Sequence, residues 1–245
     1  MPEAEVAAFR SLRTRVLERI ADASVRAGRD PADVTLVAVS KTVPPDRLRD
    51  AVVAGLDLLG ENRVQEALGK VGQVPGARWH LVGPLQSNKV RRALEAFAMI
   101  ETVDSVGLAE RIDRLAPDVG RDRVPVLLQV NVDLDPSKAG FLPDDLPAAL
   151  ETLTALDRLE VRGLMTIGRQ VERPEEARAT FAGLRAISVG LRRAWPGLGP
   201  ELSMGMTDDF PIAVEEGATI VRVGRALFGE RPHVHVEGEQ PDHAH

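Results

Sequence analysis

The chain has 245 residues and a formal net charge of −6 at pH 7, and 44% of its residues are hydrophobic. This is the composition of a globular protein that can bury a sizeable core, and α/β barrels of this length fold as one domain. The acidic balance gives no basic field for nucleic acid. The absence of cysteine excludes disulfides, cysteine–metal sites and cysteine nucleophiles.

Two further features concern location. No segment is long and apolar enough to span a membrane. The first residues are acidic and lack the pattern of a signal peptide. We therefore expect a cytoplasmic protein.

The chain opens with a helical period that runs to about residue 27, where Gly28 and Pro31 end it. Apolar runs typical of buried strands then alternate with helical patterns. The expected strands are residues 34–39, 56–60, 78–82, 98–101, 124–132, 158–166, 202–204 and 218–223. The expected helices after the first are residues 45–54, 61–71, 88–96, 105–115, 145–156, 174–190, 208–216 and 224–228, with Thr207 as the cap before residue 208.

Eight strands in alternation with helices predict an α/β protein, a single (β/α)₈ TIM barrel with an extra N-terminal helix, over residues 1–230. A doubly wound open sheet is the alternative, because strands 56–60 and 202–204 are short. Residues 231–245 contain four histidines among glycine, proline and acids, without periodicity. We expect a disordered tail there and no metal site, since nothing fixes a ligand geometry.

Lys41 follows the apolar β-branched run 34–39, and Pro44 breaks the strand pattern just after it. Lys41 is therefore predicted at the carboxyl end of a buried strand. Desolvation there favours the neutral amine, which is the form that makes a Schiff base. The alternative is a lysine whose stem packs while its charge reaches water.

The last two strands carry a candidate phosphate site. Barrels of this class commonly bind phosphate with the loops after strands seven and eight. Here those positions hold Ser203, Gly205, Arg222 and Gly224. The glycine N–H groups can face an anion, and Ser203 adds a hydroxyl. Arg222 could neutralise phosphate or meet a ring nitrogen, and the glycines could instead only make tight turns.

A lysine on strand one and a phosphate site at strands seven and eight point to pyridoxal phosphate. A racemase that works from both faces of this cofactor needs a second base. Tyrosine and cysteine, two common choices, are absent from the chain. His80 is a candidate, but a lone histidine beside Trp79 on a strand is more often a hydrogen-bonded structural residue.

Six motifs in order resemble the pyridoxal phosphate homeostasis protein family: residues 38–42 (AVSKT), 60–66 (GENRVQE), 79–89 (WHLVGPLQSNK), 163–167 (GLMTI), 202–206 (LSMGM) and 221–224 (VRVG). The resemblance covers about residues 4–229. It implies a barrel like that of alanine racemase, without that enzyme's second domain. It also implies pyridoxal phosphate bound through Lys41 by a protein without established turnover, which buffers, delivers or detoxifies the cofactor.

The resemblance also implies the roles of individual residues. Asn62 should lie beside the pyridoxal ring, and Arg222 close to the cofactor. The residues expected to contact phosphate are Ser203, Gly205 and Gly224. Two positions depart from the family pattern: Val43 replaces a usual lysine and Arg63 a usual aromatic residue. We expect the first to remove a charge that aids cofactor transfer, and the second to alter the rim of the pocket.

Two other functions stay open. The same lysine and phosphate site would serve an amino-acid racemase or lyase, or a sugar-phosphate barrel in which Lys41 clamps charge. Apoenzymes that depend on pyridoxal phosphate are candidate partners, although no sequence feature marks their surface. With no second domain to dimerise through, we expect a monomer.

Overall fold

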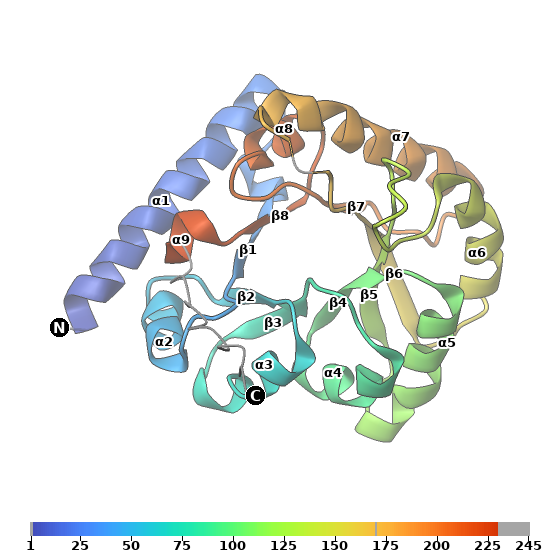
Figure 1. The fold of residues 1–245 in the computed structure, drawn as a ribbon, viewed down its shortest axis with the longest axis horizontal. Coiled ribbons are helices and arrows are strands. Elements are labelled where there is room, and N and C mark those ends of the chain that lie inside the picture. The colour runs from blue at the N-terminus through green and yellow to red at the C-terminus, as the bar shows by residue number, and fades with distance from the viewer. Residues whose placement is uncertain (1, 170, 230–245) are drawn as a thin grey trace, which may run out of the picture.

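The computed structural model describes residues 2–169 and 171–229. Eight parallel strands close into a barrel in the order of the sequence (Figure 1). The strands are β1 (Thr35–Val39), β2 (Leu58–Glu61), β3 (Arg78–Leu81), β4 (Met99–Val103), β5 (Val124–Gln129), β6 (Leu159–Met165), β7 (Glu201–Ser203) and β8 (Ile220–Val223). Closure comes from β8, which pairs with β1 from Thr35↔Ile220 to Ala38↔Val223. The predicted TIM barrel is confirmed, and the open sheet is excluded.

Helices surround the barrel, as expected where parallel strands need crossover connections. The α-helices are α1 (Pro2–Arg26), α2 (Pro45–Val53), α3 (Val64–Leu68), α4 (Val90–Ala96), α5 (Val106–Leu115), α6 (Leu146–Leu153), α7 (Arg178–Ala194), α8 (Phe210–Glu215) and α9 (Arg225–Phe228). Short 3₁₀ turns are η1 (Pro31–Asp33), η2 (Val71–Gln73), η3 (Ser87–Lys89), η4 (Pro117–Val119), η5 (Pro143–Asp145) and η6 (Pro174–Ala177). No helix in these two ranges has the length and apolar character needed to cross a membrane.

The extra helix α1 covers the side of the barrel where its first and last strands meet. The helix after β8, α9, has only four residues, so it leaves this side open. Helix α1 packs there against α8, α2 and α9 (Figure 1). Its buried stripe includes Phe9, whose ring meets that of Phe228 edge-on at 5.7 Å between centroids. The extra N-terminal helix therefore occupies the position of an eighth outer helix, between α8 and α2.

The expected helix 61–71 is wrong at its start, and this error affects the site. Residues up to Glu61 continue β2, and α3 begins only at Val64. Glu61 is fully buried in the barrel wall. Its polar character suggested the start of a surface helix, but buried partners bond to one oxygen of the carboxylate, as described below.

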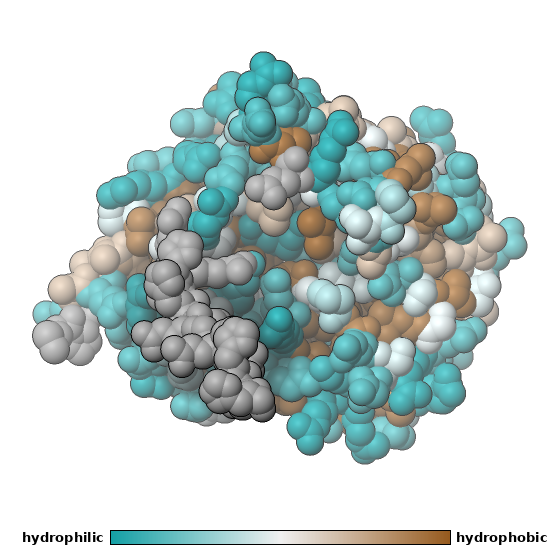
Figure 2. All heavy atoms as spheres, viewed as in Figure 1, coloured by the Kyte–Doolittle hydropathy of each residue, from teal (hydrophilic) through white to brown (hydrophobic). Residues whose placement is uncertain are grey.

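The apolar core has two parts. The larger part fills the space between the strands and the outer helices. A smaller cluster inside the barrel consists of Val37, Leu58, Val82, Met99, Leu127, Met165 and Ile220. Outside, hydrophilic residues dominate much of the face that Figure 2 shows, with apolar residues between them. The packed interior leaves the carboxyl ends of the strands as the place for a site.

Candidate functional site

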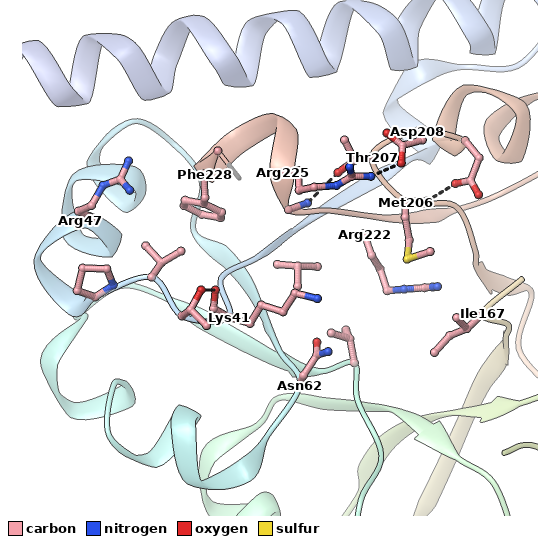
Figure 3. Close-up of a pocket in the computed structure, with 18 residues that line it drawn as sticks. Lys41, Arg47, Asn62, Ile167, Met206, Thr207, Asp208, Arg222, Arg225 and Phe228 are labelled. Carbon is pink, nitrogen blue, oxygen red and sulfur yellow. Dashed lines mark hydrogen bonds and ion pairs between the residues drawn. The ribbon is translucent and has the colours of Figure 1, made fainter. Parts of the chain in front are cut away.

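A cavity of about 600 Å³ opens at the carboxyl ends of β1, β2 and β8 and beside the loop after β7. Four of the six predicted site residues line it: Lys41, Asn62, Arg222 and Gly224. Figure 3 shows the Lys41 side chain pointing toward the part of the cavity that holds Arg222, with Asn62 below it. The topology therefore brings together side chains that are far apart in the sequence.

Lys41 lies in a tight turn between β1 and α2. The Ser40 N–H donates to the Gly60 oxygen at 2.9 Å, and the Val43 N–H donates back to the Ser40 oxygen at 3.0 Å. Thr42 has a φ of 65°, in the left-handed region that β-branched residues avoid. Pro44 then precedes α2 as its N-cap residue. The lysine is thus fixed at the strand end by a turn whose backbone is strained.

Four residues behind this turn form what we call the lysine-support cluster: Ser40, Glu61, Glu66 and Lys70. The Lys70 ammonium donates to Glu61 at 2.7 Å and to Glu66 at 2.9 Å. The Ser40 hydroxyl also donates to Glu61, at 2.7 Å. Burial raises the pKa of Glu61, while the hydrogen bond and charge of Lys70 act in the opposite direction. The cluster gives Oε1 of Glu61 two donors, from Ser40 and Lys70, whereas the buried Oε2 has no hydrogen-bond partner. The positive charge of Lys70 offsets part of the cost of burying this carboxylate.

A second buried group, which we call the arginine network, contains Arg222, Ser203, Glu101 and His80. The guanidinium donates to the Ser203 hydroxyl at 2.6 Å and to the Thr166 carbonyl oxygen at 2.8 Å. Ser203 in turn donates to Glu101 at 2.6 Å. Burial lowers the pKa of Arg222, and the negative charges of Glu101 and Asp209 oppose that shift. Arg222 therefore reaches the cavity as a cation held on two sides.

His80 is a member of this network. Its Nδ1 lies 2.7 Å from Glu101, and its side chain is buried. The expected hydrogen bond of His80 is confirmed, and His80 is not among the residues that line the cavity.

Ser203 and Gly205 do not line the cavity. Ser203 is fully buried, and its hydroxyl is engaged by Arg222 and Glu101. Gly205 has a φ of 88°, and a Cβ there would lie 2.5 Å from that of Ala213. Close packing against α8 thus requires this glycine, whatever it binds. Contact of these two residues with phosphate stays a prediction.

Gly224 does line the cavity, beside the loop after β7. A Cβ at this position would lie 3.2 Å from the Val39 oxygen, so the small residue lets β8 end close to β1. Its N–H donates to the Thr207 hydroxyl at 3.3 Å. The prediction that Thr207 caps the next helix is wrong: α8 begins at Phe210 after Asp209, and Thr207 faces Gly224 instead.

The sequence reasoning missed several polar residues of the cavity: Thr207, Asp208, Asp209 and Arg225. Arg225 is paired with Asp208 across the cavity edge (Figure 3). Asp209 accepts the Met206 N–H at 2.6 Å, and burial raises its pKa against that bond and the charge of Arg222. These residues directly follow the β7 motif or Gly224, and adjacent loops of a barrel face each other, which is the signal that could have found them.

The two departures from the family pattern have different surroundings. Val43 is buried and forms part of the cavity wall. Arg63 is exposed just before α3 and does not line the cavity. A change at Val43 therefore alters the cavity wall directly, whereas Arg63 is not part of the cavity lining.

Comparison with known proteins places the chain among relatives. Residues 20–232 match the family described as "Alanine racemase, N-terminal domain". A pyridoxal phosphate homeostasis protein of Pseudomonas aeruginosa is 45% identical over 220 residues, which are 89% of this chain and 93% of the relative. The chain belongs to the pyridoxal phosphate homeostasis protein family.

Solved structures agree with this assignment. PipY of Synechococcus elongatus, with pyridoxal phosphate bound, is 46% identical with a TM-score of 0.76, over 87% of this chain and all (100%) of PipY. Alanine racemase of Clostridium difficile shares the fold with a TM-score of 0.70 at 15% identity. That match spans 90% of this chain and 57% of the racemase, so the shared fold covers only part of that enzyme.

Proposed function

We propose that this protein binds pyridoxal 5′-phosphate in the cavity and serves cofactor homeostasis, as a buffer or a donor. The observation that carries the proposal is the meeting of Lys41 and the buried Arg222 in one cavity, in a chain 46% identical to a protein solved with this cofactor bound. An amine and a guanidinium are the groups needed for an aldehyde that also carries a phosphate.

The residues present fit this cofactor. Lys41 would hold it covalently: the neutral amine replaces the aldehyde oxygen, and one water leaves. Arg222 supplies a fixed positive charge, and Asn62 a neutral amide, and both line the cavity. The Thr207 hydroxyl, which accepts the Gly224 N–H, and the Arg225 guanidinium are further donors of the cavity lining for an anion. When bound, the cofactor supplies an electron-withdrawing ring joined to the lysine.

We further infer that the protein does not turn substrate over. The support is compositional and geometric: the chain has no tyrosine or cysteine, and one nitrogen of His80 is engaged by Glu101. Transfer of the cofactor to apoenzymes, a cytoplasmic location and a monomeric state remain predictions made from the sequence.

A racemase or lyase is the second candidate, because Asp209 places a titratable carboxyl group in the cavity. Burial raises the pKa of Asp209, which makes the neutral acid more accessible. Exchange of the α-proton of amino acids in deuterated solvent measures this activity. No exchange across a broad panel is expected, and exchange that is lost in Asp209→Asn would establish the enzyme.

An absorbance titration tests binding. Pyridoxal phosphate added to the purified protein should give the visible band of a protonated Schiff base, saturating at one equivalent. Lys41→Ala should remove the band, whereas Lys89→Ala, a lysine outside the cavity lining, should keep it. Binding that leaves no such band would favour the sugar-phosphate barrel, with Lys41 as a charge clamp.

A further inference from the structure

We propose that Lys70 and Glu66 are positioning residues that fix the backbone on both sides of Lys41 and so present its amine to an aldehyde. The inference rests on the proposed function and adds residues outside the cavity. Neither Lys70 nor Glu66 lines the cavity. Both belong to the lysine-support cluster, which lies behind the turn.

The first contact is on the peptide that leads into Lys41. The Lys70 side chain is buried, and its ammonium donates to the Ser40 carbonyl oxygen at 3.0 Å. The same nitrogen donates to Glu61 at 2.7 Å and to Glu66 at 2.9 Å. An ammonium has three donors, so these three acceptors fix its position completely. The Ser40–Lys41 peptide is thereby tied to β2 and to α3.

The second contact is on the peptide that leaves Lys41. Oε1 of Glu66 accepts the N–H of Thr42 and the ammonium of Lys70 at the same time. Thr42 has a φ of 65°, which a threonine adopts only when its surroundings impose it. The hydrogen bond to Glu66 holds Thr42 in this conformation, together with the turn bond from the Val43 N–H to the Ser40 oxygen. One ion pair therefore joins the carbonyl before Lys41 to the N–H after it.

This arrangement does more than a buried ion pair needs to do for stability. Such pairs contribute little net stability, because desolvation offsets their attraction. Apolar side chains of the same volume would fill the space as well, but they could not bond to either peptide. Imine formation depends on the direction of the amine, and a misplacement of about 1 Å can cost on the order of 100-fold in rate. Precise presentation of Lys41 explains why polar groups occupy this position.

The variants separate positioning from folding. Glu66→Ala removes the Thr42 contact from a side chain that is 25% exposed, so the fold should survive. Glu66→Gln is the conservative variant, since its amide oxygen can still accept the N–H. Lys70→Met combined with Glu61→Gln removes the ammonium without leaving a lone buried carboxylate. Glu95→Ala is the matched control: it breaks another i,i+4 pair, with Arg91 on α4.

Two readouts are measured on the full-length protein. The first is the rate of imine formation with pyridoxal, which lacks the phosphate, followed by absorbance and by borohydride trapping on Lys41. The second is amide hydrogen exchange of the peptide around Thr42 without any cofactor. We expect Glu66→Ala and the double variant to slow imine formation about tenfold and to speed exchange. Glu66→Gln should stay within about threefold, and Glu95→Ala should match the wild type.

The outcomes distinguish failure of the positioning role from failure of the proposed function. Wild-type rates in both Glu66→Ala and the double variant would overturn the positioning role while leaving the proposed function intact. Equal rate losses in Glu95→Ala at equal thermal stability would overturn it too, because the effect would then be general. No trapped imine on wild-type Lys41 would overturn the proposed function, and this inference with it.

Discussion

The lysine-support cluster, at β1, β2 and α3, and the arginine network, on β3, β4, β7 and β8, hold two residues of the same cavity, but they act on different parts of their targets. Lys70 and Glu66 bond to the backbone on either side of Lys41. Ser203 bonds to the guanidinium of Arg222 itself, and the Thr166 carbonyl oxygen holds its other nitrogen. The lysine-support cluster fixes the backbone of Lys41, and the arginine network fixes the guanidinium of Arg222.

The difference suits the two proposed roles, a Schiff-base lysine and an anion-binding arginine. A lysine that reacts must move its amine between the aldehyde and the released state, so only its base can be fixed. An arginine that recognises a fixed charge benefits from a rigid head group. All four members of the arginine network are buried, whereas one member of the lysine-support cluster, Glu66, is partly exposed. Substitutions in the arginine network should therefore cost more stability.

The largest expected loss is in Glu101→Leu. This change removes the carboxylate that His80 and Ser203 contact and leaves the charge of Arg222 buried without it. Breaking a buried charge network costs about 4 kcal/mol in the free energy of unfolding. Urea denaturation of the cofactor-free protein measures this. A loss below about 1 kcal/mol, the level of a surface pair, would remove the contrast between the two groups.

Lys70→Met should come next, at about 3 kcal/mol near neutral pH, because Glu61 loses its cation. The loss should shrink as the pH falls. Burial already raises the pKa of Glu61, and a group with a raised pKa favours folding at low pH and disfavours it as pH rises through that pKa. Denaturation at several pH values checks the slope. A second change, Glu61→Gln, should restore much of the loss, and a loss independent of pH would contradict this account.

Ser203→Ala tests the hydroxyl that links Arg222 to Glu101 in the arginine network. The hydroxyl both accepts from Arg222 and donates to Glu101, so its removal leaves two buried charged groups each short of one bond. We expect a loss of about 2 kcal/mol in stability and weaker binding of pyridoxal phosphate. Denaturation and absorbance titration measure the two effects. Unchanged binding together with lost stability would show that Arg222 does not depend on Ser203 for its position.

The smallest expected effect is that of Glu66→Gln on stability. Burial alone would raise the pKa of Glu66, but hydrogen bonds from Lys70 and from the Thr42 N–H lower it overall. A carboxylate with a lowered pKa stabilises the fold above its unfolded pKa and loses that contribution as pH falls through the folded value. The free energy of unfolding of the wild type should thus exceed that of the variant by less than about 1 kcal/mol at pH 7. The gap should close below the ordinary value of 4.5.

Much of the fold could be predicted from the sequence because parallel strands buried on both faces leave continuous apolar runs. Boundaries failed where a polar residue was buried. Glu61 looked like the start of a helix, yet it ends β2 because Lys70, nine residues later, neutralises it. Local pattern carries no information about such a partner.

The site residues were also only partly predictable from the sequence. Strand topology alone brought Lys41, Asn62, Arg222 and Gly224 to one cavity. Ser203 was expected to contact phosphate, but its hydroxyl donates to Glu101, which is 102 residues away in the sequence. Whether a strand-end hydroxyl faces the cavity or the interior depends on such distant partners. The contacts of the arginine network could therefore not be predicted from the sequence, because they join residues of four different strands.

The most direct test of the central claim is to find where pyridoxal phosphate attaches. The protein is mixed with one equivalent of cofactor, reduced with borohydride, digested and analysed by mass spectrometry. We expect a pyridoxyl phosphate group on Lys41 and its loss from this site in Lys41→Ala. A wild-type protein that is modified at another lysine, or at none, would contradict it.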